Sequence, residues 1–270
     1  MSDSLDTDAG ADPVLILLHG ATLNGRMWDP VRHRLDPRYR ILAPDLPGHG
    51  ARRGSRYTLD GAVATVVAAA RSVAPAPVVL VGDSLGAYTA MASAASLPPD
   101  QLKGLVLGGS TFSFFGPSVF PYVLRGWIFR ALAALFGEQR MVARLMPKTL
   151  GPGKLDLHPL DARALMDAGI SVTVFAQAVK ALRRLEFRAV LAAIEQPVLI
   201  VNGDKDTVNV RQEASFLAVA RDATCHRFKD CEHGVSLWRH AEFAGLINAF
   251  ADRVFASRTL AQAHDRKPAA

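Results

Sequence analysis

The sequence predicts an α/β fold: a mostly parallel sheet of about six strands, with helices on both faces and a helical cap insertion. Short apolar segments rich in branched residues alternate with helix-length segments along most of the 270 residues. Such alternation is typical of a parallel sheet that is covered on both faces. The alternation stops between residues 111 and 185, where aromatic residues recur at helical spacing.

Each element follows from this pattern. Strands are expected at Val14–Leu18, Arg40–Pro44, Val78–Val81, Leu102–Leu107, Val198–Val201 and Cys225–Phe228. Helices are expected between most of them, at Asn24–Leu35, Leu59–Val73, Leu85–Leu97 and Arg211–Arg221. In the insertion we expect helices over Pro121–Phe136 and Asp161–Leu185, joined by a loop at 147–159 that is rich in Gly, Pro and Lys. The predicted division is a flexible N-terminus at 1–12, a core at 13–111 and 186–256, a helical cap at 112–185 and a flexible tail at 257–270.

Composition excludes several classes of protein. Half of the residues are hydrophobic, and the net charge of +6 comes from scattered basic residues that we interpret as a solvated surface. No basic strand with interleaved aromatic residues suggests nucleic-acid binding, and Arg or Lys interrupts each long apolar stretch, so we expect no stable membrane insertion. The acidic start of the chain does not resemble a signal peptide, and we expect a cytoplasmic protein with Cys225 and Cys231 reduced. The sequence contains no motif that implies a metal or a cofactor, and it does not determine the oligomeric state.

A predicted strand ends in Gly82-Asp83-Ser84-Leu85-Gly86, directly before an Ala-rich helical segment. Gly-x-Ser-x-Gly between a strand and a helix indicates a strained turn that exposes the serine hydroxyl above the sheet. Two glycines at this turn allow strand and helix to approach closely. Ser84 is therefore the candidate nucleophile.

A serine nucleophile needs a base and a group that orients the base. Asp204 and Asp206 both follow the predicted strand Val198–Val201. We favour Asp206, because its spacing carries the carboxylate beyond the strand into the loop, and we keep Asp204 as the alternative. His233 lies in the loop after the last predicted strand and completes the chain order Ser, Asp, His.

The loop after the first strand, Leu17-Leu18-His19-Gly20-Ala21-Thr22, is the expected source of one oxyanion donor. We predict that the N–H groups of Ala21 and Leu85 form the oxyanion hole. Thr22 is a candidate for lining the substrate site. We expect His19 to hold the loop through hydrogen bonds.

Together these segments resemble the alpha/beta-hydrolase superfamily, especially its esterase, cofactor-free haloperoxidase and lyase branches. The matching motifs are Leu18-His19-Gly20, Asp45-Leu46-Pro47-Gly48-His49-Gly50, Gly82-Asp83-Ser84-Leu85-Gly86, Gly203-Asp204-Lys205-Asp206 and His233-Gly234 followed by Glu242-Phe243. They extend from Val14 to about Phe250 apart from the cap. One departure is Ala51-Arg52-Arg53, where relatives often have Ser soon after Gly-His-Gly.

The residues and the resemblance predict a serine hydrolase that cleaves a small or medium, mainly apolar carboxylic ester through an acyl-enzyme. The expected partner is a small-molecule ester substrate, with Phe115 and Trp127 of the cap as candidate substrate-binding residues. The same scaffold also supports a lyase, a carbon–carbon bond hydrolase, a thioesterase or an acyltransferase. A ligand-binding receptor that turns over slowly is the alternative from another class.

Overall fold

One parallel sheet forms the centre of the protein. The computed structural model describes residues 12–150, 155 and 157–265. Within these residues the sheet has six strands in the order β2-β1-β3-β4-β5-β6, and every neighbouring pair is parallel. The strands are β1 (Val14–Leu18), β2 (Arg40–Leu42), β3 (Val78–Asp83), β4 (Leu102–Gly108), β5 (Val198–Gly203) and β6 (Ala223–Phe228). The predicted fold class is confirmed.

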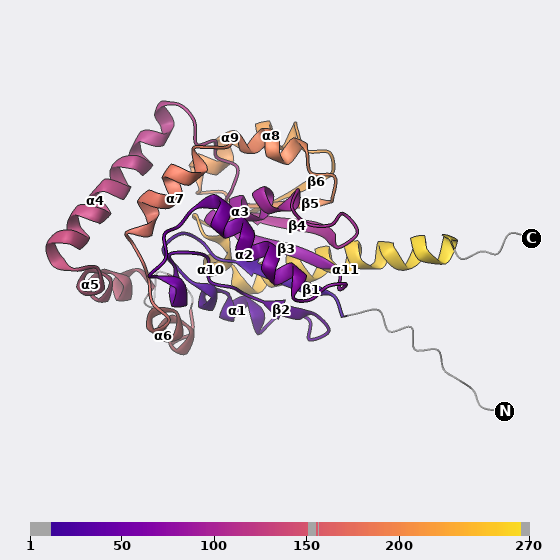
Figure 1. Ribbon diagram of the computed structural model, residues 1–270, viewed down its shortest axis with the longest axis horizontal. Helices are drawn as coiled ribbons and strands as arrows, with labels where there is room; N and C mark the ends of the chain where they lie inside the picture. The colour runs from indigo at the N-terminus through magenta and orange to yellow at the C-terminus, as the bar shows by residue number, and fades with distance from the viewer. Residues whose placement is uncertain (1–11, 151–154, 156, 266–270) are drawn as a thin grey trace, which may run out of the picture.

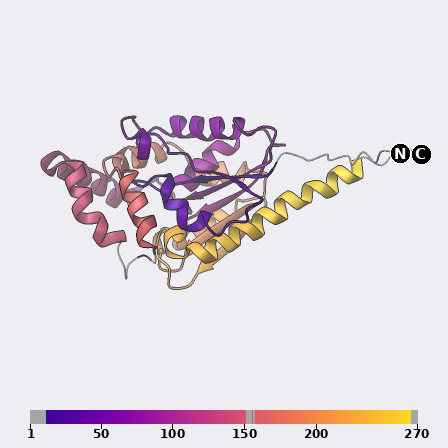
Figure 2. The same ribbon diagram turned by 90° about the horizontal axis from the view of Figure 1, so that it is seen from below.

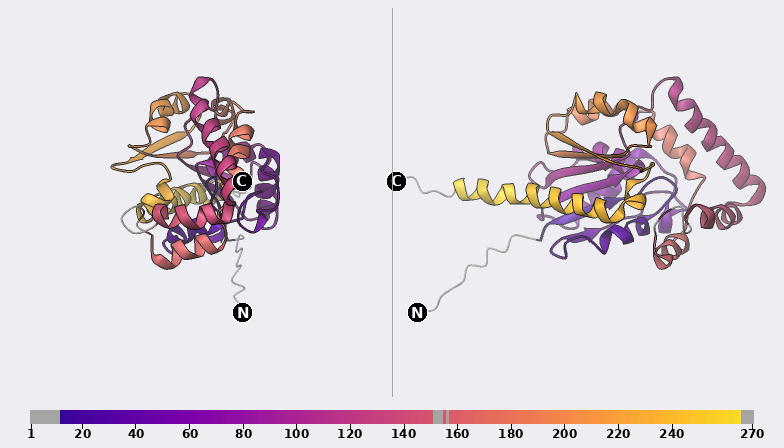
Figure 3. Two further views of the ribbon diagram at one scale, coloured as in Figure 1. Left: turned by 90° about the vertical axis from the view of Figure 1, so that its left-hand side faces the viewer. Right: turned by 180° about the vertical axis from the view of Figure 1, so that it is seen from behind.

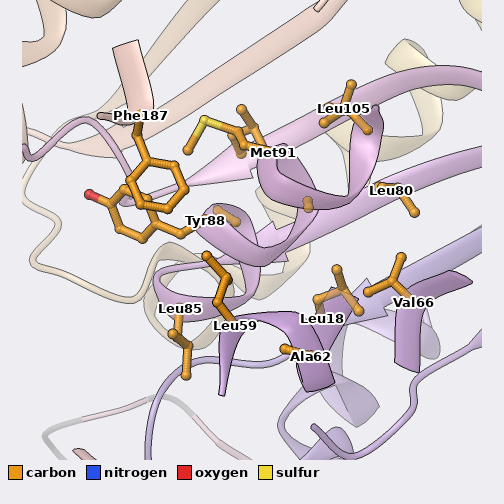
Figure 4. Packing of buried hydrophobic residues seen from close by; sticks show 14 of the residues in the cluster. Leu18, Leu59, Ala62, Val66, Leu80, Leu85, Tyr88, Met91, Leu105 and Phe187 are labelled. Atoms are coloured by element: carbon orange, nitrogen blue, oxygen red, sulfur yellow. The ribbon is translucent and has the colours of Figure 1, made fainter. Parts of the chain in front are cut away.

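Helices cover both faces of this sheet (Figure 2). Along β1, Ile16 and Leu18 face one hydrophobic cluster while Leu15 and Leu17 face the other, as the two-residue period of a strand requires. The first cluster includes α2 (Leu59–Arg71), α3 (Leu85–Ala94) and α8 (Phe187–Ala192), and Figure 4 shows its packing. The second includes η1 (Gly25–Trp28), α1 (Asp29–Arg32), α10 (Val235–Trp238) and α11 (His240–Asp265). The remaining core elements are η2 (Gly50–Arg52) and α9 (Thr207–Leu217).

The chain between β4 and β5 contains a helical insertion that lies at one end of the molecule, away from the described end of α11 (Figures 1 and 3). Its elements are η3 (Pro117–Val119), α4 (Phe120–Phe136), α5 (Glu138–Leu150), α6 (Pro159–Asp167) and α7 (Val174–Leu182). Helices α4 and α7 pack closely at Gly126, where an added Cβ would lie 3.0 Å from Ala176. Asn24 holds α6 against the core, because its side-chain amide donates to the carbonyls of Leu165 and Gly169 at 2.9 Å.

The outer side of α4 is strongly apolar. Large exposed side chains follow one another along the helix, at Phe120, Leu124, Trp127, Ile128, Leu135 and Phe136. The segment Pro117–Phe136 is long and apolar enough to cross a membrane by length and composition alone, and only 11% of it is buried. From the sequence alone we expected Arg or Lys to interrupt every apolar stretch of this length. Arg125 and Arg130 lie in this segment, but its mean hydropathy is still high enough for a membrane span. Absence of stable insertion remains a prediction.

Several expected boundaries are wrong. The predicted helix Asn24–Leu35 is a 3-10 turn followed by the short α1, and Asp161–Leu185 is divided at Gly169, which has a φ of +96°. Helix α9 begins four residues earlier than predicted, because the Asp206 side chain accepts a hydrogen bond from the backbone N–H of Asn209 and caps it. Part of the expected loop at 147–159 belongs to α5, and 151–154 and 156 lie outside the described residues.

The predicted ends of the chain have different outcomes. The expected flexible N-terminus at 1–12 lies outside the described residues, apart from Asp12. The expected tail begins at 257, but α11 continues to Asp265, and 266–270 lie outside the described residues. Both cysteines are free, as expected from the sequence: Cys225 is exposed and Cys231 is buried.

The junction of β3 and α3 depends on two glycines. A Cβ on Gly82 would lie 2.4 Å from the backbone nitrogen of Ala87, and one on Gly86 would lie 1.9 Å from the carbonyl oxygen of Leu18. Both obstacles are main-chain atoms in buried elements, so no side-chain rotation relieves the overlap. These glycines therefore allow α3 to lie directly over the ends of β1 and β3.

We expect Gly86→Ala to lower the free energy of unfolding by about 3 kcal/mol or more, because overpacking against backbone forces the main chain to move. Gly245→Ala is the matched control, since an added Cβ there meets nothing within 4 Å and the residue lies in α11. Alanine favours the helix, so the control should gain up to about 1 kcal/mol. Urea unfolding of the three proteins measures both effects, and equal stability of the Gly86 variant and the parent would contradict the packing argument.

Candidate active site

Ser84 occupies the sharp turn that the sequence predicts. Its φ and ψ are 54° and −116°, outside the regions that side chains ordinarily favour, and helix α3 begins at the next residue. The turn is held by the backbone N–H of Ser84, which donates to the carbonyl of Gly108 on β4 at 2.7 Å. This strained backbone directs the hydroxyl away from the core, at the carboxyl end of the sheet.

Ser84, His233 and Asp206 form one hydrogen-bonded chain. The Nε2 atom of His233 lies 2.8 Å from the Ser84 hydroxyl, and its Nδ1 lies 2.6 Å from Oδ2 of Asp206. Since an ionised carboxylate only accepts, Nδ1–H donates to Asp206 and Nε2 is left to accept the serine proton. The three side chains come from the ends of β3, β5 and β6, which meet at one edge of the parallel sheet.

Opposing effects set the proton affinities of this pair. Burial disfavours the imidazolium of His233, but the hydrogen bond and negative charge of Asp206, with the charge of Asp83, outweigh it and raise the pKa of His233. Burial also disfavours the carboxylate of Asp206, but the hydrogen bonds from His233 and Asn209 outweigh that effect and lower its pKa. The arrangement favours a carboxylate beside an imidazole that readily accepts a proton.

Asp204 has a different position from Asp206. Its Oδ1 accepts a hydrogen bond from the backbone N–H of Cys231 at 3.1 Å, and its own N–H donates to the carbonyl of Phe228 at 2.9 Å. Asp204 therefore braces the loop that carries His233, whereas Asp206 contacts the imidazole itself. Of the two aspartates that the sequence left as candidates, the geometry favours Asp206.

The two predicted oxyanion donors, Ala21 and Leu85, line the same pocket as Ser84. Leu85 is the first residue of α3, where N–H groups have no partner within the helix. His19 holds the loop of Ala21, because its Nδ1 donates to the carbonyl of Gly20 and its Nε2 accepts from the N–H of Leu46, both at 2.9 Å. Burial lowers the pKa of His19 to about 4, so it remains neutral in this structural role.

Thr22 does not line the pocket. Its backbone turns away with a φ of 71°, and its carbonyl accepts a hydrogen bond from the N–H of Ser171 at 2.9 Å. Its predicted role at the substrate site came from its place in the loop after the first strand. The turn instead uses Thr22 to join the first loop to the helical insertion.

The pocket above Ser84 has a volume of about 240 Å³ and a mainly apolar wall. The apolar side chains that residues 112–185 contribute to its lining are Phe112, Phe114, Tyr122, Phe175, Ala178, Val179 and Leu182. Phe115 and Trp127, the predicted substrate-binding residues, are not part of it: they are 46% and 63% exposed, and Trp127 lies beneath the guanidinium of Arg130. Aromatic content identified the insertion, but it did not show which helix face is turned inward.

Sequence reasoning missed two polar residues that support the site. Asn209 donates from Nδ2 to Asp206 at 2.7 Å, while its Oδ1 accepts from the N–H of Thr111 at 2.7 Å. Asp83 is fully buried, and its Oδ2 accepts from the N–H of Ser236 at 3.0 Å, which connects β3 to the start of α10. The sequence signal for Asn209 is its place three residues after Asp206, which caps α9. This signal was missed because the helix was predicted to start at Arg211.

Within the described part of the chain, no group of three or more His, Cys, Asp or Glu side chains is arranged to hold a metal ion. The site as described consists of a serine, an imidazole, a carboxylate and two nearby backbone N–H groups. This arrangement is suited to nucleophilic attack on a carbonyl.

Comparisons with known proteins show the family of the chain. The sequence model of the alpha/beta hydrolase family matches residues 15–246. The pimeloyl-[acyl-carrier protein] methyl ester esterase of Serratia marcescens is 31% identical over 243 residues, covering 87% of this chain and 92% of that protein.

Solved structures of similar fold include an esterase from Thermogutta terrifontis, with a TM-score of 0.69 and 20% identity, covering 91% of each chain. A bromoperoxidase from Bacillus anthracis has a TM-score of 0.72 and 19% identity, covering 89% of this chain and 92% of that one. At these identities the structural likeness shows the fold alone.

We expect His233 to titrate above the ordinary imidazole value of about 6.5, and Asp206→Asn to lower its pKa. The substitution removes the negative charge that favours the imidazolium, so the titration moves to lower pH. An NMR titration of the imidazole protons, assigned with His233→Gln, measures the shift. Asp204→Asn is the matched control and should leave the titration nearly unchanged; a larger shift in the control than in Asp206→Asn would reverse the assignment.

Proposed function

The chain belongs to the alpha/beta hydrolase family, and we propose that it is a serine esterase that cleaves a small or medium carboxylic ester through an acyl-enzyme. The observation that carries the proposal is the continuous hydrogen-bonded chain from the hydroxyl of Ser84 through His233 to Asp206. The match to esterases along most of the chain supports the same class of reaction.

In the proposed mechanism, the hydroxyl of Ser84 attacks the ester carbonyl while Nε2 of His233 accepts the serine proton. Asp206 holds the imidazole with Nδ1–H toward the carboxylate and stabilises the imidazolium that forms. His233 then returns the proton to the departing alkoxide, which leaves as the alcohol. Water, deprotonated by the same imidazole, attacks the acyl-enzyme and releases the acid and free Ser84.

Negative charge develops on the carbonyl oxygen during both attacks. We propose that the backbone N–H groups of Ala21 and Leu85 stabilise it, since both residues line the pocket of Ser84. The positive end of helix α3 lies at the same position and favours that charge. His19 supports one donor by holding its loop in place.

The size and chemistry of the pocket favour a small ester. Its volume of about 240 Å³ lies below the usual range of roughly 300–1,000 Å³ for drug-sized ligands. The apolar wall suits an aliphatic acyl chain. Several relatives are named pimeloyl-[acyl-carrier protein] methyl ester esterases. Their names favour a methyl ester of a carrier-linked acyl group as the natural substrate.

We further propose that the insertion at 112–185 acts as a cap that selects substrates. It supplies Tyr122 and the inner face of α7 to the pocket of Ser84. Ligands of open α/β sheets bind at the carboxyl ends of the strands, so an insertion there shapes the pocket without taking part in bond cleavage. The expected cytoplasmic location remains part of this proposal.

We expect Ser84→Ala to abolish hydrolysis of p-nitrophenyl esters, with a loss on the order of 10⁶ in kcat, as for other serine triads. A fluorophosphonate probe should label the parent protein and not the variant. Retention of near-parent activity by folded, pure Ser84→Ala would refute the proposed nucleophile. If the parent protein instead forms one equivalent of stable acyl-enzyme and then shows negligible turnover, the slow-turnover receptor is favoured.

Trimming Phe175 to Ala should shift the preferred acyl chain toward longer esters, because Phe175 lines the pocket and its removal opens space. Each added methylene should change the activation free energy that corresponds to kcat/KM by at most about 1–3 kcal/mol. A series of p-nitrophenyl esters from acetate to decanoate measures the profile. Trp127→Ala is the control, since Trp127 is exposed outside the pocket; the cap proposal fails if both variants keep the parent profile.

A further inference from the structure

The wall of the pocket above Ser84 contains one cation, Arg125 of α4. The same residue also lines a neighbouring groove of about 380 Å³ between α4 and α9. The two cavities share Phe112, Tyr122, Arg125 and Val208, so they adjoin along a common wall. Arg125 therefore lines both the pocket of Ser84 and the groove beside it.

The groove is cationic. Arg211 of α9 lines it together with Arg125, and no Asp or Glu is part of its lining. Among the residues that the structure describes, neither guanidinium forms an ion pair within 4.0 Å. The one carboxylate in the lining of the adjoining pocket is Asp206, which is engaged by His233 and Asn209. The two arginines thus present positive charge that the protein itself does not neutralise.

Some described arginines are paired with carboxylates, and others, such as Arg56 and Arg183, form no ion pair within 4.0 Å. Arg188 pairs with Glu186 at 2.9 Å, and Arg227 pairs with Glu213. Arg125 and Arg211 are both exposed, and they are distinguished by lining one groove from two different helices, with Arg125 also lining the pocket of Ser84. A guanidinium stays charged at all ordinary pH values and presents planar pairs of donors that match a carboxylate or a phosphate.

We infer that this groove binds an anionic group, a carboxylate or a phosphate, at the end of the substrate remote from the ester. The inference rests on the proposed esterase function and names the chemistry of its substrate. Phe112, Tyr122 and Val208 form the shared apolar wall between the two cavities. The substrate accordingly has an ester at one end, an apolar middle and a negative charge at the other.

Matched pairs of substrates test this inference. The first pair is the dimethyl and the monomethyl ester of one straight-chain dicarboxylic acid, which differ by a single negative charge. The second pair is a methyl-ester acyl chain on pantetheine and on 4′-phosphopantetheine, which differ by the phosphate. We expect the parent protein to have a higher kcat/KM for the charged member of at least one pair, mainly through a lower KM; the pair that responds identifies the anion.

Arg125→Gln should lower the ratio of charged to neutral kcat/KM about tenfold, since charge-assisted hydrogen bonds are the strong ones. Arg211→Gln should lower the same ratio. Arg130→Gln is the matched control, because Arg130 lies on the same helix but against Trp127 and outside both cavities. Fluorophosphonate labelling of Ser84 confirms that each variant is folded at the active site.

The possible failures are distinguishable. If none of the four esters is hydrolysed in a Ser84-dependent manner, the proposed function is wrong. If they are hydrolysed but the parent shows no preference in either pair, only the anionic substrate is excluded. A preference that survives in the Arg125, Arg211 double variant likewise overturns this groove as the anion site.

Discussion

The close approach of α3 to the ends of β1 and β3 is the constraint on which the rest of this structure depends. Gly82 and Gly86 permit it, because a single Cβ at either position would enter the backbone of a neighbouring element. The contact forces Ser84 into its strained conformation and brings Leu85, at the start of α3, beside the loop that carries Ala21. Without it, the hydroxyl and the two backbone N–H groups would not share one pocket.

The imidazole and the carboxylate reach that pocket through a second set of close contacts. The loop of His233 packs against Gly203, where a Cβ would lie 2.2 Å from the carbonyl of Cys231. Asn209 connects Asp206 to Thr111, the residue at which the chain leaves the sheet for the insertion. The buried Asp83, next to the serine, accepts from the N–H of Ser236 and so joins β3 to α10. The polar groups around the site are therefore held by both the core and the start of the insertion.

The insertion shapes the pocket without supplying any group of the hydrogen-bonded chain. Tyr88 fixes its first residues, since the phenol donates to the carbonyl of Phe112 at 2.8 Å and accepts from its N–H at 3.0 Å. Helix α4 then packs on α7 through Gly126, which leaves Tyr122 and Arg125 facing the pocket and Trp127 facing outward. One helix thus separates an inward side that contacts the proposed substrate from an exposed apolar side.

Local pattern was sufficient for the strands, the strained turn at Ser84 and the chain order of a serine, an aspartate and a histidine, because alternation, glycine placement and strand ends are properties of short segments. Those properties predicted the fold class, Ser84 and His233, and they favoured Asp206 over Asp204. The choice between the two aspartates, the support from Asn209 and the inward face of α4 were decided only by tertiary structure. Each depends on which groups meet in the folded chain. Asp206 becomes the cap of α9 and so brings Asn209 to the site. Helix α4 has no clear apolar stripe, and its inner face is defined only when α7 packs against Gly126.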